Sequence, residues 1–155
     1  FGDDLIATEH AGNRVIRLAQ GGPVELLKIE EPSALLKVGG DLYTASWTSG
    51  EILQIGANNT MLAQARTVAS GFSRPEGLAW RNGEFIVREG DSGNIFAVTM
   101  TGNKKLLTTV SAGSAAASAA QPLSMVFNDV AVDAAGNIYA SGETDRVLYR
   151  FGSQP

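Results

Sequence analysis

The chain has 155 residues, of which 44% are hydrophobic and 18% charged, with a formal net charge of −4 and no cysteine. This length and composition suit one folded domain and exclude an intrinsically disordered chain, while the lack of cysteine excludes disulfides and thiol chemistry. No Lys or Arg cluster marks a surface for nucleic acid or an anionic membrane, and no apolar run is long enough to span a bilayer. We therefore expect a soluble protein, and the sequence leaves a secreted or periplasmic location open.

Four segments of the chain share one pattern, in which a polar residue and an apolar pair are followed by a polar turn and an alternating apolar strand. In chain order they are Asp4–Leu18, Asp41–Ile55, Glu84–Val98 and Asn137–Phe151. A glycine precedes each of the last three segments, at Gly40, Gly83 and Gly136. Because glycine adopts positive φ without steric cost, we expect these three residues to form tight hairpin turns.

Further apolar runs flank each shared segment and complete a unit of four strands. The runs before it are Ala34–Val38, Gly77–Trp80 and Val130–Val132, and those after it are Val24–Ile29, Met61–Val68 and Lys105–Val110. A four-stranded unit that recurs about every 40 residues is typical of a β-propeller blade. We therefore predict an all-β fold, a β-propeller of four-stranded antiparallel blades whose first and last blades are incomplete.

We expect residues 1–155 to form a single propeller or half-propeller domain with blades at about 1–31, 32–71, 72–111 and 121–151. Residues 112–120 are an Ala/Ser-rich insertion, for which we favour a flexible connector over a short helix. Four blades can close a small ring, pair with a second copy or belong to a longer chain. We favour a homo-oligomer or a part of a longer chain, since an open arc would leave apolar blade faces exposed.

Propeller topology predicts where a site would lie, because strand starts and loops of the same kind meet at one rim of the central channel. Glu76, Asn128 and Asp129 enter first strands, so we expect them to converge at the channel mouth. Carboxylate and amide oxygens suit a hard cation such as calcium. The loops around them add four candidate ligand contacts, Trp47, Glu89, Asp91 and Glu143.

Two stretches, Arg74–Trp80 (RPEGLAW) and Asn128–Tyr139 (NDVAVDAAGNIY), resemble the repeat of NHL-type and virginiamycin-lyase-like propellers. The second also resembles the senescence-marker-protein/gluconolactonase family, whose motif F-N-D-G-x-x-D-x-x-G-R is matched at Phe127, Asn128, Asp129, Asp133 and Gly136. This resemblance implies that Asn128 and Glu76 bind a divalent metal and that Asp129 approaches the substrate. Val130 departs from the motif, which has glycine there, and the remaining ligands of the family belong to later blades.

These observations support three hypotheses about function. The first is a metal-dependent lactone or ester hydrolase, in which a metal at Glu76 and Asn128 activates a water molecule and Asp129 assists. The second is a non-catalytic NHL-type module that binds a protein, glycan or other ligand on its loop rim. The third is a repeat scaffold, a half-propeller that assembles with itself.

Simpler structural roles compete with each candidate site residue. Asn128 and Asp129 can cap the entry of a blade, and Glu76 can be a solvated carboxylate at the rim. We expect Asp133 to be a turn residue and His10, the only histidine, to lie in an exposed turn rather than act as a general base. Trp47 can pack between blades instead of stacking on a ligand. The letters GDSG at residues 90–93 match a protease motif by chance, since no histidine accompanies them in frame.

Overall fold

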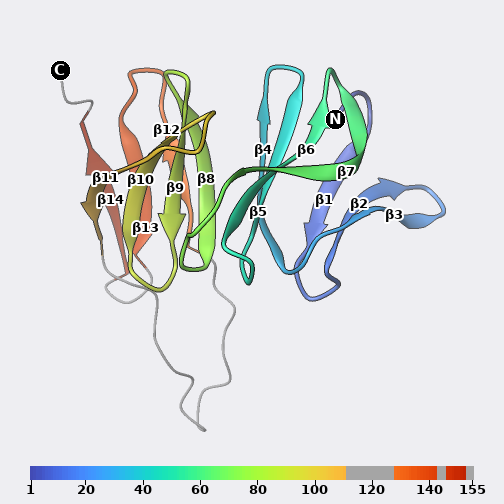
Figure 1. The fold of residues 1–155 in the computed structure, drawn as a ribbon, viewed down its shortest axis with the longest axis horizontal. Helices are drawn as coiled ribbons and strands as arrows, with labels where there is room; N and C mark the ends of the chain where they lie inside the picture. Colours follow the sequence, from blue (N-terminus) through green and yellow to red (C-terminus); the bar gives the residue numbers. More distant parts are fainter. Residues whose placement is uncertain (111–127, 143–145, 153–155) are drawn as a thin grey trace, which may run out of the picture. The chain divides into compact units, whose positions relative to one another are not determined.

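The computed structural model describes residues 1–110, 128–142 and 146–152, and these residues form 14 strands and no helix. The strands make four antiparallel sheets, each ordered as in the sequence (Figure 1). The prediction of an all-β fold built from propeller blades, with incomplete first and last blades, is thereby confirmed. The predicted insertion at residues 112–120 lies outside the described residues. Within the described part of the chain, no helix has the length and hydropathy that crossing a bilayer requires.

Each sheet corresponds to one of the repeated sequence units, and we number the blades accordingly. Blade 1 contains β1 (Leu5–Glu9), β2 (Arg14–Ala19) and β3 (Gly22–Lys28). Blade 2 contains β4 (Pro32–Val38), β5 (Asp41–Ser46), β6 (Glu51–Ala57) and β7 (Thr60–Ala69). Blade 3 contains β8 (Pro75–Arg81), β9 (Glu84–Glu89), β10 (Asn94–Thr99) and β11 (Lys104–Thr109). Blade 4 contains β12 (Val130–Val132), β13 (Ile138–Gly142) and β14 (Val147–Phe151).

The chain divides into two compact units, which we describe separately: unit 1 is Phe1–Pro75 and unit 2 is Glu76–Pro155. In unit 1, aliphatic side chains of blades 1 and 2 pack into one cluster that includes Val15, Leu27, Ile29, Leu42, Leu53 and Ile55. In unit 2, blades 3 and 4 share a cluster of Ala79, Ile86, Ile95, Ala97, Val110, Val130, Ile138 and Ala140. Burial of these side chains between adjacent sheets supplies the main stabilising free energy of each unit.

Two of the three glycines predicted to form hairpin turns have positive φ, and the third does not. Gly83 and Gly136 have φ values of 88° and 80°, as a tight turn between strands requires. In blade 2, however, the residue with positive φ is Gly39, at 58°, and not Gly40. The carbonyl of Gly40 instead accepts a hydrogen bond of 2.7 Å from the backbone N–H of Asn59, which explains its different conformation.

The two incomplete blades leave exposed apolar side chains. In blade 1, Leu5 and Leu18 are cross-strand partners and are 66% and 46% exposed. In blade 4, Val147 and Leu148 of β14 are also exposed. Exposed apolar side chains that lie next to one another mark an interaction surface more often than a free face. The predicted association with a second copy or with further blades stays a prediction, in which these exposed residues are the candidate contacts.

Candidate functional site

Within unit 2, the structure brings Glu76 and Asn128 together although 52 residues separate them in the sequence. Glu76 lies at the start of β8, and Asn128 lies two residues before the start of β12. Both the backbone N–H and the side-chain Nδ2 of Asn128 donate hydrogen bonds of 3.1 Å to Oε2 of Glu76. The carboxylate of blade 3 is thus fixed to the entry of blade 4.

A third residue, Arg88, completes this arrangement, and the sequence analysis did not identify it. Arg88 lies in β9, its side chain is 0% exposed, and its Nη1 is 3.2 Å from the same Oε2 atom. Nη1 also donates a hydrogen bond of 3.4 Å to the backbone carbonyl of Glu89. We call Glu76, Arg88 and Asn128 the Glu76 cluster. It combines a buried cation, an almost buried carboxylate and a primary amide.

The Glu76 cluster provides few of the ligands that a divalent cation needs. Asn128 presents a nitrogen to the carboxylate, and Arg88 already supplies the carboxylate with a positive charge. The described residues contain no group of three or more His, Cys, Asp or Glu side chains that could hold a metal ion. Calcium prefers six to eight oxygen ligands, so the arrangement does not fit this cation as it stands. The metal role of Glu76 and Asn128 stays a prediction that a binding measurement must test.

Asp129, the predicted catalytic residue, is exposed and hydrogen-bonded to residues of its own blade, in β12 and β13. Its Oδ1 accepts a hydrogen bond of 2.7 Å from the backbone N–H of Val130, and its backbone N–H donates one of 2.9 Å to Oγ of Ser141. These contacts match the simpler role of capping the start of a blade.

The remaining acidic candidates differ in their surroundings. Glu89 is buried, and its Oε2 accepts hydrogen bonds from Oγ of Ser92, in the turn that follows β9, and from Nδ2 of Asn94, at the start of β10. Asp91 is exposed in the same turn. Glu143 lies outside the described residues. Glu89 therefore stabilises its own loop, and Asp91 remains the more accessible of the two.

In unit 1, Trp47 is half-buried at the centre of a group of loop residues. The Arg74 guanidinium lies 4.4 Å from the centroid of the indole ring, and the ring of His10 meets Trp47 edge-on at 5.8 Å. The backbone N–H of Trp47 donates a hydrogen bond of 3.0 Å to the carbonyl of Glu31. His10 is thus half-buried against an aromatic ring, and the prediction that it is exposed is wrong. Trp47 links the loops of blades 1 and 2, which agrees with the predicted packing role.

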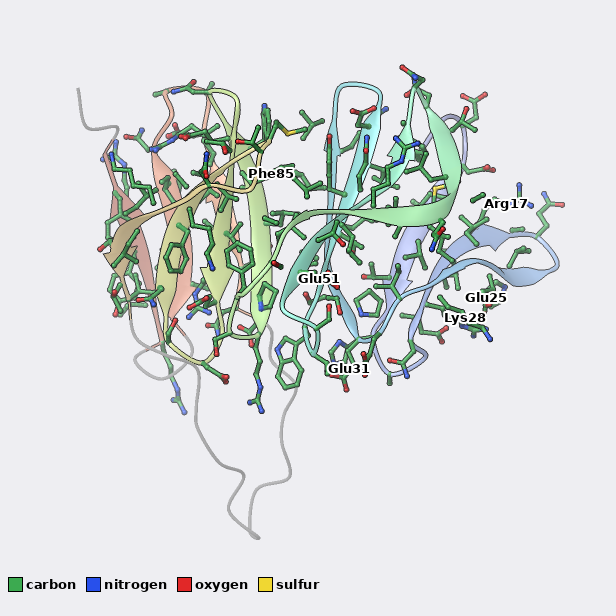
Figure 2. All side chains as sticks on the ribbon, viewed as in Figure 1. Arg17, Glu25, Lys28, Glu31, Glu51 and Phe85 are labelled. Atoms are coloured by element: carbon green, nitrogen blue, oxygen red, sulfur yellow. The ribbon has the colours of Figure 1, made fainter. Side chains whose placement is uncertain are left out.

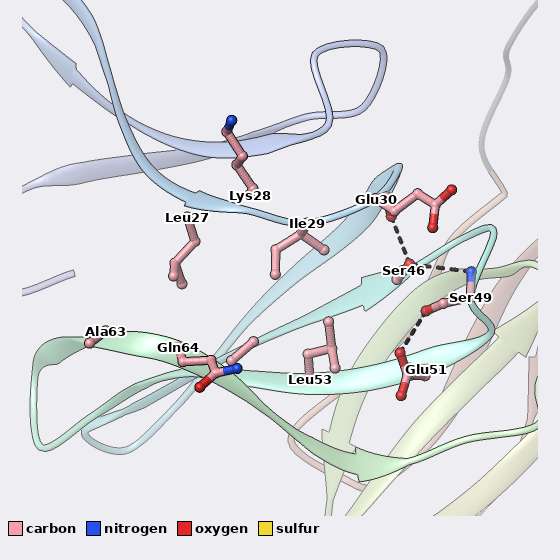
Figure 3. A pocket seen from close by; sticks show the side chains of 11 residues that line it. Leu27, Lys28, Ile29, Glu30, Ser46, Ser49, Glu51, Leu53, Ala63 and Gln64 are labelled. Atoms are coloured by element: carbon pink, nitrogen blue, oxygen red, sulfur yellow. Dashed lines mark hydrogen bonds between the residues drawn. The ribbon is translucent and has the colours of Figure 1, made fainter.

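A cleft of about 450 Å³ opens beside these loops, between the outer strands of blades 1 and 2 (Figure 3). Its apolar surface is formed by Leu27, Ile29, Leu53, Ala63 and Ala65. Its polar lining residues are Lys28, Glu30, Ser46, Ser49, Glu51 and Gln64. Lys28 alternates with Leu27 and Ile29 along the chain, and its ammonium points away from Leu53 in Figure 3. Glu51 of β6 and Lys28 of β3 are also labelled in Figure 2.

Oγ of Ser49 and Oγ1 of Thr67 donate hydrogen bonds of 2.8 and 3.0 Å to the two carboxylate oxygens of Glu51. Oγ of Ser46 donates one of 2.7 Å to the backbone carbonyl of Glu30. These bonds hold one side of the cleft in a fixed arrangement. The cleft was not foreseen from the sequence, because its lining residues come from segments far apart in the chain.

Asp133 forms a separate hydrogen-bonded turn in blade 4, in agreement with its predicted role. Its carboxylate accepts hydrogen bonds from Nδ2 of Asn137 at 2.8 Å, from the backbone N–H groups of Ala135 and Asn137 at 2.9 Å, and from the Tyr139 hydroxyl at 3.0 Å. These donors, the Asn137 side chain first among them, lower the pKa of Asp133 from its usual value.

Comparison with solved structures shows the same fold, whereas no family model and no curated protein matches the chain. Virginiamycin B lyase from Staphylococcus aureus has 12% identity and a TM-score of 0.61, with coverage of 99% of this chain and 54% of the lyase. A structure from a nidogen–laminin complex has 14% identity and a TM-score of 0.66, with coverage of 96% and 60%. A protein assigned as a gluconolactonase has 16% identity and a TM-score of 0.58, with coverage of 98% and 60%.

These similarities confirm the predicted likeness to virginiamycin-lyase and gluconolactonase-type propellers. At such identities they establish the fold alone. The chain spans little more than half the length of each of these three structures. Propellers that are enzymes and propellers found in protein complexes both occur among them, so the site has to be judged from its own geometry.

Proposed function

We propose that this chain is a ligand-binding portion of a β-propeller, and that the cleft of unit 1 takes an extended polypeptide segment of a protein partner. The cleft itself carries the proposal. Its volume of about 450 Å³ lies within the range of known ligand sites, and its lining is about half polar and half apolar. The apolar part of its lining, exposed at Ala63 and backed by the buried side chains of Leu27 and Leu53, suits one small aliphatic side chain.

The strands that border the cleft favour an extended occupant. Residues of β3 and β7 line it, and among the described strands β3 pairs only with β2 and β7 only with β6. Each is therefore the outermost strand of its blade and has one edge without a neighbouring strand. Such edges present backbone donors and acceptors that an added strand can use. A polypeptide in extended conformation is complementary to both borders of the cleft.

The charge at the cleft favours a basic side chain beside the aliphatic one. Glu51 contributes a carboxylate to the cleft, whereas the Glu30 carboxylate and the Lys28 ammonium are both directed away from Leu53 in Figure 3. The hydroxyl groups of Ser49 and Thr67 already orient Glu51, so little conformational entropy is lost when a cation binds there. The net charge of −4 favours approach of a basic segment as well.

Some structures with this fold have bound partners. One is a propeller in a complex of nidogen and laminin, and another is the lyase crystallised with quinupristin. These examples support ligand or protein binding as a use of the fold, and the occupant proposed here rests on the cleft.

A display experiment tests the proposal. A library of unstructured peptides on phage is selected against the purified chain, and we expect enriched peptides to carry an aliphatic residue next to Lys or Arg. Ala63 is exposed on β7, so the substitution Ala63→Arg fills the cleft and repels a basic peptide without disturbing the core. We expect a selected peptide to bind this variant at least about tenfold more weakly than the wild type.

The control adds the same charge away from the cleft. Gln20→Arg changes an exposed turn residue in blade 1 and should leave peptide affinity unchanged. The proposal fails if selection enriches no common pattern, or if the selected peptides bind Ala63→Arg as tightly as the wild type.

The second candidate is the metal-dependent lactone or ester hydrolase, and the convergence of Glu76 with Asn128 is the observation in its favour. In this function the two residues would hold the cation and Asp129 would assist at the reacting group. The ion pair of Glu76 with Arg88 gives it less support than the cleft gives to peptide binding. It predicts calcium-dependent hydrolysis of a gluconolactone that is lost in Asn128→Ala. Equal rates with calcium and with a chelator would remove this candidate.

A further inference from the structure

We infer that the guanidinium of Arg88 supplies the positive charge that a divalent cation would otherwise supply to Glu76, so that blades 3 and 4 are joined here without a metal. The Glu76 cluster takes one residue from each of three places: the start of β8, the end of β9 and the entry to β12. Its contacts therefore connect two strands of blade 3 with the first strand of blade 4.

Burial shows that the two charges depend on each other. The Arg88 side chain is 0% exposed and that of Glu76 is 11% exposed. An ionised group with so little access to water is tolerated only when an opposite charge and hydrogen bonds compensate it. Nη1 of Arg88 and Oε2 of Glu76, 3.2 Å apart, provide that compensation within the cluster. A divalent cation bound to the same carboxylate would lie next to a buried like charge.

The oxygen that a cation would use is already occupied. Oε2 of Glu76 accepts hydrogen bonds from Nη1 of Arg88, from the backbone N–H of Asn128 and from Nδ2 of Asn128. A carboxylate oxygen has two lone pairs, so three donors saturate it. The other oxygen, Oε1, lies so close to Gly90 that an added Cβ at that position would overlap it. Gly90 thereby leaves the space that the carboxylate fills.

The cluster also explains why Asn128 is buried beside an exposed Asp129. Its backbone and side chain donate to one oxygen of the neighbouring blade, a role that an aspartate at the same position would oppose by charge repulsion. The motif resemblance places a metal ligand here, whereas the contacts of this chain use the same amide to bind a carboxylate across two blades. The chain has the propeller fold, and the charge that balances Glu76 comes from Arg88 of the same chain.

Thermal unfolding of the whole chain with calcium chloride and with a chelator tests the inference. The wild type should unfold at the same temperature in both, and calorimetric titration with calcium should give no binding heat. Arg88→Met and Glu76→Gln should each lower the midpoint by roughly 10 °C, because each leaves a buried polar partner uncompensated. The midpoint of the double variant should fall by less than the sum of the decreases in the two single variants, as expected for a coupled pair.

Calcium that raises the midpoint of the wild type, together with loss of that rise in Glu76→Gln, would overturn the inference. Additive losses in the double variant would also overturn it, since they would show that the two side chains do not act as a pair. The titration of the wild type needs no variant and decides the matter even if Arg88→Met fails to fold.

Discussion

Asn128 donates two hydrogen bonds, both of 3.1 Å, from its backbone and side-chain nitrogens to the same oxygen of Glu76. This double contact connects blade 3 to blade 4 at the point where the chain enters β12. The sequence allowed Glu76 to be an exposed carboxylate at the rim, whereas in the structure its side chain is nearly buried.

The substitution Asn128→Ala removes the side-chain donor while the backbone donor stays in place. We expect a loss of about 1–3 kcal/mol in the free energy of unfolding, because a buried acceptor and its ion pair lose a partner. Urea unfolding measures this loss. Asn103→Ala, in an exposed turn, is the control and should change stability little. Equal stability of Asn128→Ala and the wild type would show that the side-chain contact contributes nothing.

Gly77 permits the close approach of blades 3 and 4. A Cβ at this position would lie 2.7 Å from the backbone nitrogen of Val130 and 3.0 Å from Cα of Asp129. Because these are backbone atoms, no side-chain rotation relieves the clash, and Gly77→Ala should destabilise unit 2 by about 1–3 kcal/mol. Gly21→Ala is the matched control, since no atom lies within 4 Å of its added Cβ. Similar unfolding curves for the two variants would contradict this account of the junction.

The Asp133 turn makes stability depend on pH. Hydrogen bonds, led by that of the Asn137 side chain, lower the pKa of Asp133 in the folded state. A group with a lowered folded-state pKa adds stability above its unfolded-state pKa, and this contribution is lost as the pH falls through the folded-state value. Asp133→Asn should therefore be less stable than the wild type at neutral pH, and the difference should shrink in acid.

Urea unfolding at a series of pH values measures that difference, with Asp3→Asn as an exposed control. A stability gap between Asp133→Asn and the wild type that stays constant down to strongly acidic pH would rule out the proposed linkage.

The exposed leucines of blade 1 predict self-association of the isolated chain. Leu5 and Leu18 face each other across β1 and β2, on a blade that lacks an inner strand among the described residues. Burial of such side chains against another blade is favourable by about 25 cal/mol for each Å² of apolar surface removed from water. We expect light scattering to show masses above that of one chain, and Leu18→Lys to reduce them. A stable monomer at high concentration would contradict this prediction.

Most of the fold was predictable because blade strands repeat a simple alternation of side chains. Each predicted hairpin corresponds to a pair of strands, and Asp133 was expected in a turn because it lies in the hairpin that contains Gly136. The error at Gly40 arose because two adjacent glycines can each take the positive φ, and only the contact with Asn59 selects Gly39.

The site was less predictable, since it depends on contacts between blades. The convergence of Glu76 and Asn128 followed from topology, but Arg88 was missed. A charged residue near the end of a strand is usually exposed. Its one sequence signal is its position directly after the apolar run Phe85–Val87, whose members are all buried. The cleft gave no sequence signal, because Leu27 and Ala63 belong to different blades.

The central claim is that unit 1 binds an extended basic-aliphatic segment in its cleft, while the Glu76 cluster is structural. The most direct test is to titrate isotope-labelled protein with a peptide from the phage selection and to follow backbone amide signals by NMR. We predict saturable shifts at cleft residues such as Leu27, Leu53 and Ala65, with the signals of Asn128 and Arg88 unchanged. Shifts centred on Asn128 and Arg88, with the cleft unaffected, would contradict the account.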